Sequence, residues 1–209
     1  MTLPEYGAFS YADACVELEK VYEPEGNRIR VKDQTEGFFL LLFDNLDKKV
    51  LADLETGLTV LDWGCGAGKG TSMLQEKFPN SKATGLDASK TAIKHCKEDY
   101  PTITFTDEKI NCAYDMIINS NCLEHFSNPV DVILYHLDYT WKYYVILVPF
   151  EGATDNLICS HITRVTDETF PKKLGEFKLL QSKKVFGGPY KGCWYGDQLL
   201  QVYERSIDR

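Results

Sequence analysis

Residues 58–68 read Leu-Thr-Val-Leu-Asp-Trp-Gly-Cys-Gly-Ala-Gly, an apolar segment that runs into an acidic residue and a glycine-rich turn. Because glycine has no Cβ atom, such a turn can adopt positive φ and let backbone N–H groups approach a ligand at the start of the next helix. Apolar residues then recur at helical spacing (Met73, Leu74 and Phe78), and a second short strand follows at residues 82–86. This order predicts a strand, a loop, a helix and a second strand, the repeating unit of a parallel sheet.

Two nucleotide-binding patterns fit this loop poorly. A phosphate-binding P-loop requires glycine where the chain has Trp63, and serine or threonine where it has Gly70. A dinucleotide fingerprint of the form G-x-G-x-x-G requires its third glycine where Lys69 stands, although a glycine or alanine one position away keeps that pattern loosely open. The sequence therefore disfavours a P-loop and leaves dinucleotide binding as a weaker alternative.

A third interpretation includes the acidic residue before the turn. Asp62, Gly64, Gly66 and Gly68 form the pattern acid-x-Gly-x-Gly-x-Gly, with the acid at the end of the strand, where it can face a cationic ligand. A sulfonium compound with a free amino group meets that demand, whereas a pyrophosphate does not. The segment Val60–Gly68 resembles the first motif of class I S-adenosylmethionine-dependent methyltransferases. The resemblance implies S-adenosyl-L-methionine as the cofactor and S-adenosyl-L-homocysteine as the product.

The resemblance extends from residue 58 to residue 150 and implies the rest of the cofactor site. Asp87 follows Gly68 by about 20 residues, the separation at which an acidic side chain meets ribose hydroxyls in a unit of this kind. The resemblance also implies an acidic residue near the adenine amino group, for which Asp107 is the candidate and Glu108 the alternative. The cofactor-binding residues expected on this basis are Asp62, Gly64, Cys65 (through its backbone), Gly66, Gly68, Asp87, Ala88, Asp107, Glu108, Asn119 and Ser120.

Short strands and helices alternate along the chain, as in a parallel sheet that helices cover on both faces. Together with the resemblance, this order predicts an α/β fold: a doubly wound, Rossmann-like, mostly parallel sheet of seven strands with an antiparallel last strand. Residues 178–185 and 198–204 are the expected last two strands, joined by the loop 187–196. We expect a single methyltransferase domain over 1–209, with an N-terminal helical cap (1–50), a cofactor-binding core (51–150), and substrate-side loops with a C-terminal hairpin (151–209).

The start of one helix can be predicted from two residues. Asn128 followed by Pro129 is a typical pair for the N-cap and the first helical turn. We expect His136 to lie at the surface or boundary of this helix. The apolar side chains expected to face the core are Val130, Ile133, Leu134 and Leu137.

Candidate catalytic residues are expected in the loops after each strand, because ligands of such sheets bind outside the carboxyl ends of the strands. Methyl transfer from a sulfonium is an in-line displacement, so positioning supplies most of the catalysis, and a general base is needed mainly for a hydroxyl acceptor. His125, after the fourth strand, is the first candidate base, against a role in packing its loop. His161, after the fifth strand, is the second: its segment resembles the loop that closes the family's substrate pocket, and a solvated loop histidine is the alternative.

Further residues are candidates for contacts with the methyl acceptor. Glu124 and Glu151 could position an amine or a hydroxyl, or else cap a helix or face water. Arg164 follows closely after the second candidate base. Trp194 and Tyr195, in a glycine-flanked loop, could form a lid or a sugar-stacking wall, or an ordinary hairpin cluster.

Composition is that of a compact enzyme. The 209 residues are 44% hydrophobic, which suffices for one domain with a full core. A formal net charge of −8 disfavours a nucleic-acid substrate, whose phosphates must be neutralised. No apolar run reaches the roughly twenty residues of a membrane span and the first residues do not resemble a leader, so we expect a cytoplasmic protein without a membrane partner. The seven cysteines are scattered and never spaced as Cys-x-x-Cys, which indicates neither a disulfide framework nor a zinc site.

Absent motifs narrow the acceptor. The loop after the fourth strand reads Asn-Ser-Asn-Cys at 119–122, without the Pro-Pro-aromatic signature of DNA base methyltransferases or the paired-glutamate loop of arginine methyltransferases. No Asp/Asn cluster matches a magnesium-dependent catechol site, so we expect a reaction without a metal. A small-molecule acceptor remains. The Leu-Glu-His segment (123–125) and the Val-Pro ending of the fifth strand (148–149) resemble methyltransferases of quinone, sugar and secondary-metabolite pathways, which implies an acceptor of that type, methylated on oxygen or nitrogen. We expect a monomer or a homodimer.

Two other classes of function stay open. One is an NAD-dependent oxidoreductase on the same strand–helix–strand unit, which the position of Asp62 disfavours. The other is a non-catalytic partner subunit that binds S-adenosylmethionine, since an intact glycine loop implies cofactor binding and says nothing about turnover.

Overall fold

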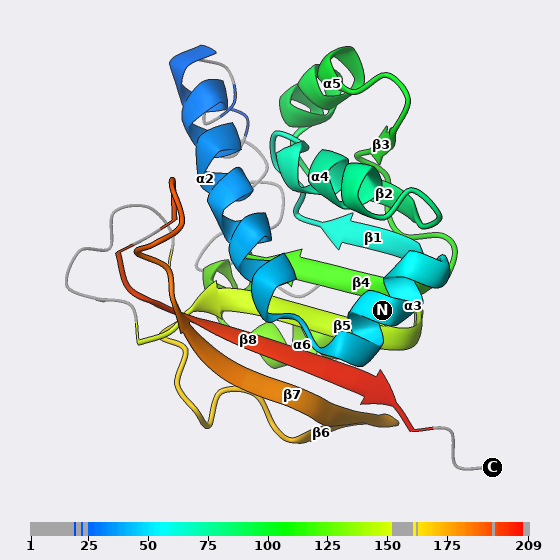
Figure 1. Ribbon diagram of the computed structural model, residues 1–209, viewed down its shortest axis with the longest axis vertical. Helices are drawn as coiled ribbons and strands as arrows, with labels where there is room; N and C mark the ends of the chain where they lie inside the picture. The colour runs from blue at the N-terminus through cyan, green and yellow to red at the C-terminus, as the bar shows by residue number, and fades with distance from the viewer. Residues whose placement is uncertain are drawn as a thin grey trace.

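The computed structural model describes residues 19, 22, 25–151, 161, 163–193 and 195–206, and in this part of the chain eight strands form one sheet (Figure 1). Their order is β3-β2-β1-β4-β5-β8-β7-β6, and β1 to β5 are parallel to one another. The chain starts in the middle of the sheet, moves outward to β3 and returns to β4, which is a doubly wound topology. The bounds are β1 Thr59–Trp63, β2 Lys82–Leu86, β3 Thr104–Thr106, β4 Tyr114–Ser120, β5 Thr140–Pro149, β6 Lys173–Leu174, β7 Phe177–Phe186 and β8 Asp197–Arg205.

The C-terminal strands extend the sheet by one strand more than expected. The α/β class, the mostly parallel sheet and the antiparallel last strand are confirmed: β8 runs antiparallel to both β5 and β7. The additional strand is β6, which pairs with β7 at the edge of the sheet. Two residues are too few to produce a recognisable alternation of apolar and polar side chains, so the sequence contained no signal for β6.

Polar side chains cap the N-termini of two helices, α3 and α5. Asp47 accepts a hydrogen bond from the Lys49 backbone N–H (2.8 Å), and Ser89 Oγ accepts one from Ala92 N–H (3.0 Å). Among the described residues, no helix is both long enough and apolar enough to cross a membrane. The helices are α2 Glu25–Asn45, α3 Lys48–Thr56, α4 Lys69–Lys77, α5 Lys90–Asp99, the 3₁₀ turn η1 Leu123–His125, and α6 Pro129–Leu137.

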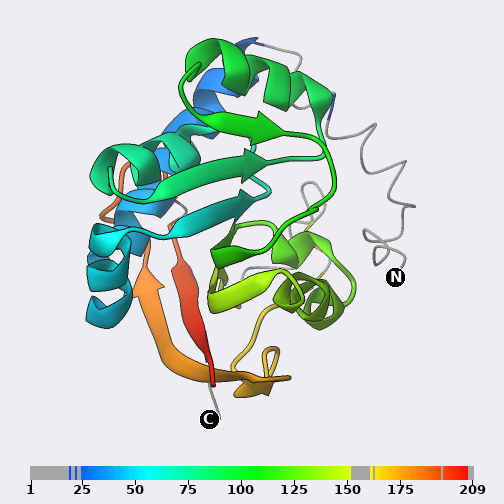
Figure 2. The same ribbon diagram turned by 90° about the vertical axis from the view of Figure 1, so that its right-hand side faces the viewer.

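Helices cover the two faces of the sheet in separate layers. Buried side chains of α2, α3 and α4, among them Phe39, Leu54 and Leu74, pack against one face. Side chains of η1, α6 and the segment 165–177 pack against the other face. Figure 2 shows α2 and α3 (blue to cyan) on one side of the sheet and α6 (green) on the other. Both faces of the parallel strands are therefore covered, as a parallel sheet requires.

The inward face of α6 differs from the expectation. Leu134, expected to be buried, is 43% exposed, whereas His136, expected at the surface or boundary, is fully buried. The His136 ring lies 4.4 Å from the Trp63 ring, centroid to centroid, and its Nδ1 is 2.8 Å from the Tyr144 hydroxyl. Because this hydrogen bond satisfies a polar atom inside the core, the helix turns His136 inward and Leu134 outward.

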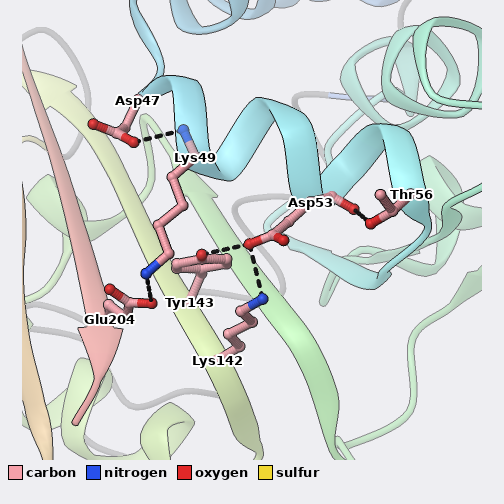
Figure 3. Close-up of polar contacts among 7 residues, drawn as sticks. All are labelled: Asp47, Lys49, Asp53, Thr56, Lys142, Tyr143 and Glu204. Carbon is pink, nitrogen blue, oxygen red and sulfur yellow. Dashed lines mark hydrogen bonds and ion pairs between the residues drawn. The ribbon is translucent and has the colours of Figure 1, made fainter.

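A group of polar contacts fastens α3 to the sheet (Figure 3). The Asp53 carboxylate accepts hydrogen bonds from the Tyr143 hydroxyl (2.6 Å) and from Lys142 Nζ (2.8 Å), both on β5. One turn earlier, Lys49 pairs with Glu204 on β8. Burial opposes ionisation of Asp53, but the hydrogen bonds from Lys142 and Tyr143 outweigh it and lower the pKa of the carboxyl. The contacts fix α3 across the junction of β5 and β8.

Candidate functional site

The carboxyl ends of the parallel strands meet at one edge of the sheet, where the chain changes direction between β1 and β4. The glycine turn follows β1, and residues 87–89 follow β2. The turn η1 follows β4, and residue 151 follows β5. The predicted site residues are thus distributed over neighbouring loops of a single edge.

The glycine turn has a backbone conformation that residues other than glycine rarely adopt. Gly64, Gly66 and Gly68 have φ of 81°, 53° and 76°, all in the left-handed region, and Gly68 directly precedes α4. A Cβ atom at Gly66 would lie 2.8 Å from the Tyr22 hydroxyl, and one at Gly68 would lie 2.8 Å from Cys96 Sγ. The turn therefore presents bare backbone at the N-terminus of a helix, the arrangement that the sequence predicts for a ligand cradle.

Two buried carboxyl groups flank this turn. Asp62 is 2% exposed and its Oδ2 accepts a hydrogen bond from the Thr71 hydroxyl (2.6 Å). Asp87 is 7% exposed and accepts hydrogen bonds from the Gly66 and Ser89 N–H groups, both at 2.9 Å. Burial raises the pKa of Asp62 to about 7 and also raises the pKa of Asp87. Two desolvated acids side by side favour a ligand that carries positive charge or hydroxyl donors.

Two residues before α2 complete this half of the site, and the sequence did not single out either. Tyr22 is 8% exposed with its hydroxyl against Gly66, and burial raises its pKa. Glu19 accepts hydrogen bonds from the backbone N–H groups of Lys90 (2.6 Å) and Thr91 (3.1 Å) at the start of α5. Neither residue belongs to a motif, and each lies far along the chain from its partner, so no local signal marks it.

A second cluster lies after β4 and β5, where η1 carries Glu124 and His125. His161 Nε2 is 3.8 Å from Glu124 Oε1, and the rings of His125 and His161 are 4.9 Å apart, centroid to centroid. Glu124 is 2% exposed, and burial raises its pKa to about 8, while burial lowers the pKa of His161. From the sequence, His125 and His161 were predicted as two separate candidate bases. The fold brings both close to Glu124.

The ends of β4 and β5 also hold two unusual backbone conformations. Asn121 and Glu151 are not glycines, yet they have φ of 50° and 47°. Such conformations cost energy and tend to occur at functional sites. Their position directly after β4 and shortly after β5 agrees with a functional role for this edge.

The other cofactor-site candidates differ in exposure. Cys65 and Asn119 are buried, and Ala88 and Ser120 are half-buried. Asp107 and Glu108 are exposed, unlike the other acidic candidates. Asp107 lines a separate hollow of about 510 Å³ together with α5 residues Lys90, Ile93, Lys94, Lys97 and Glu98.

The remaining acceptor candidates lie at the surface. Glu151 and Arg164 are exposed, and Glu151 N–H donates to the Val165 carbonyl (2.9 Å). Tyr195 is 90% exposed and meets the Phe186 ring edge to face, at 5.1 Å between centroids. Trp194 lies outside the described residues.

Comparisons with known proteins match the central part of the chain to methyltransferases. Residues 60–137 match the family described as a methyltransferase domain. A putative methyltransferase of Invertebrate iridescent virus 6 is 31% identical over 94 residues, which are 41% of this chain and 36% of that protein. Trans-aconitate 2-methyltransferase of Escherichia coli is 35% identical over 57 residues, 27% of this chain and 23% of that protein. The matched segments thus span 36% and 23% of the lengths of these two curated relatives.

The fold matches that of solved methyltransferases over nearly the whole chain. Magnesium protoporphyrin IX methyltransferase from Synechocystis PCC 6803, solved with bound SAH, superposes with a TM-score of 0.69. The superposition covers 92% of this chain and 99% of that chain, at 16% sequence identity. At 16% sequence identity, this similarity shows a shared fold.

Proposed function

We propose that this protein, whose residues 60–137 match a methyltransferase domain, transfers a methyl group from S-adenosyl-L-methionine to an oxygen or nitrogen of a small molecule. S-adenosyl-L-methionine supplies a methyl group already activated on a sulfonium. The chain's own residues then have to bind the donor, orient the acceptor and accept a proton where the acceptor is a hydroxyl.

The observation that carries the proposal is the convergence of the glycine turn with two buried carboxyl groups. At Gly64, Gly66 and Gly68 neighbouring side chains leave no space for a Cβ atom, and the positive φ values of these glycines shape the turn. Asp62 suits the amino group of the cofactor, and Asp87 suits ribose hydroxyls, because a carboxylate accepts hydrogen bonds at several lone pairs. A pyrophosphate in the glycine turn would instead face the Asp62 carboxylate, which disfavours NAD.

Support for the acceptor end comes from the cluster of Glu124, His125 and His161 at the neighbouring strand ends. His125 is the proposed general base for a hydroxyl acceptor. Trans-aconitate and magnesium protoporphyrin IX, named in the relatives above, are small molecules, and the net charge of −8 disfavours nucleic acid.

The test is a transfer assay with S-adenosyl-L-methionine labelled in its methyl group. Small molecules that carry hydroxyl, amine or carboxyl groups would be screened beside DNA and tRNA, and we expect label on a small molecule only. With that acceptor, His125→Ala should lower kcat by about 100-fold, the usual contribution of a general base, with cofactor affinity nearly unchanged.

His95→Ala is the matched control, because His95 lies on α5, away from η1, and should keep normal turnover. Label on nucleic acid would contradict the proposed acceptor class. Unchanged turnover in His125→Ala would exclude it as the base, and cofactor binding without turnover on any acceptor would favour the non-catalytic partner subunit.

A further inference from the structure

The cluster beside the proposed acceptor position has the composition of a metal site. Glu124, His125 and His161 each offer a ligand atom, a carboxylate oxygen or a ring nitrogen, and these atoms all lie within 4.8 Å of one another. Two donors bound to one ion of zinc size lie at most about 4.2 Å apart, twice a bond length of about 2.1 Å. Small rotations of the side chains are therefore enough to bring all three donors onto a single ion.

Backbone hydrogen bonds hold the two contributing segments together. Thr163 N–H donates to the Glu124 carbonyl (3.0 Å), and the Thr163 hydroxyl donates to the Phe126 carbonyl (2.6 Å). These bonds tie the chain two residues after His161 to the backbone on both sides of His125. The proximity of the donors is thus fixed by the fold of the loops and does not depend on the long side chains alone.

Glu124 provides a second, independent observation. Its side chain is 2% exposed, and its Oε2 is buried with no hydrogen-bond partner among the described residues. A buried carboxylate oxygen without a donor is costly, and native proteins usually satisfy such atoms with a partner. A cation held between the carboxylate and two imidazoles would supply that partner.

The donor set decides which kind of ion fits. Imidazole nitrogens suit zinc, manganese, iron or cobalt, whereas magnesium and calcium prefer oxygen ligands. We propose that Glu124, His125 and His161 bind one divalent first-row transition-metal ion, of the zinc, manganese or cobalt kind. Three protein ligands leave coordination positions open, as in metal sites that also bind substrate.

This proposal departs from the reaction without a metal that the sequence suggested. That expectation rested on the lack of an Asp/Asn cluster that matches a magnesium-dependent catechol site, whereas these ligands are one glutamate and two histidines, at residues 124, 125 and 161. Metal binding does not require the proposed methyl transfer, so the two proposals can fail separately. A His125 ring nitrogen bound to the ion has no free lone pair, so His125 acts as the general base only in the metal-free protein.

The test is titration of the full chain with Co²⁺ and Zn²⁺ after removal of metal with a chelator, followed by calorimetry and by the visible absorption of Co²⁺. We expect one equivalent to bind with a micromolar or tighter Kd, without the intense near-ultraviolet band of a cysteine ligand. His161→Ala should weaken binding by about 100-fold or more, and Thr163→Val, which loses only the positioning hydroxyl, by about 10-fold.

His95→Ala is the control and should bind the ion as the wild type does. Each variant would also be titrated with S-adenosyl-L-homocysteine, so that a folding defect or a failure of the cofactor site is seen separately. No binding below millimolar Co²⁺ or Zn²⁺, or equal binding by the wild type and His161→Ala, would overturn the proposal.

Discussion

Asp62 is held at the end of β1 without a cationic partner among the described residues, and burial raises the pKa of its carboxyl to about 7. The nearby Asp87, whose pKa burial also raises, adds to that shift. A cofactor amino group beside Asp62 favours the ionised form, so binding lowers this pKa and releases a proton. The strength of binding should therefore depend on pH.

We predict that the association constant for S-adenosyl-L-methionine rises from about pH 6 to about pH 7, by at most tenfold per pH unit, and levels off above the pKa of Asp62. Below that pKa the carboxyl is protonated and must lose its proton for the ion pair to form. Calorimetry at several pH values, in buffers of different ionisation enthalpy, measures both the slope and the proton released.

Asp62→Asn is the matched variant because it keeps the size of the side chain and removes its charge. It should flatten the slope and weaken binding above pH 7 by about 10- to 100-fold, the value of a charged hydrogen bond. An equally steep slope in Asp62→Asn would show that another group titrates.

The sequence indicated single site residues only where they belong to an ordered pattern. Asp62, the three glycines and Asp87 follow one another at characteristic spacing, so their convergence could be expected. Tyr22, Glu19 and the meeting of His125 with His161 depend on contacts between distant segments. Local sequence carries no information on such contacts.

Gly70 shows how two elements constrain one residue. It is the second residue of α4, and a Cβ atom there would lie 2.1 Å from the ring of Phe39 on α2, which is 1% exposed. The position that a P-loop would fill with serine or threonine thus requires glycine, because α2 packs directly on α4.

Gly70→Ala should destabilise the protein by about 1–3 kcal/mol, the usual cost of overpacking, although alanine favours a helix by about 1 kcal/mol over glycine. The free energy of unfolding from urea titration measures this change. Gly196→Ala is the control, since a Cβ atom there has no neighbour within 4 Å. Equal stability of the two variants would contradict the close packing of α2 on α4.

Element boundaries and faces were predictable to different degrees. Strands β1, β2 and the helix starts at Ser89 and Pro129 follow from apolar spacing and capping residues. The predicted buried face of α6 was wrong at Leu134 and His136. A hydrogen bond to Tyr144 offsets the cost of burying the polar ring of His136. Edge strand β6 is too short for a pattern to reveal it.

Across the whole molecule, the proposed function depends on one edge of the sheet. The parallel order β3-β2-β1-β4-β5 places the glycine turn and the histidine cluster after neighbouring strands, so a donor and an acceptor can meet there. The loop between β7 and β8 approaches α2 at the same edge, where Gly37 would clash with the Lys191 carbonyl if it carried a Cβ atom. The loops after the parallel strands, the β7–β8 loop and α2 thus all lie at this edge of the sheet.

The most direct measurement is calorimetric titration of the full chain with S-adenosyl-L-methionine, S-adenosyl-L-homocysteine and NAD, beside Gly66→Val and the control Gly196→Val. We predict micromolar binding of both sulfur ligands at one equivalent, no binding of NAD, and loss of binding in Gly66→Val alone, because its backbone has φ of 53°. Binding of NAD alone, or equal binding of the sulfur ligands by Gly66→Val and the wild type, would contradict the cofactor site.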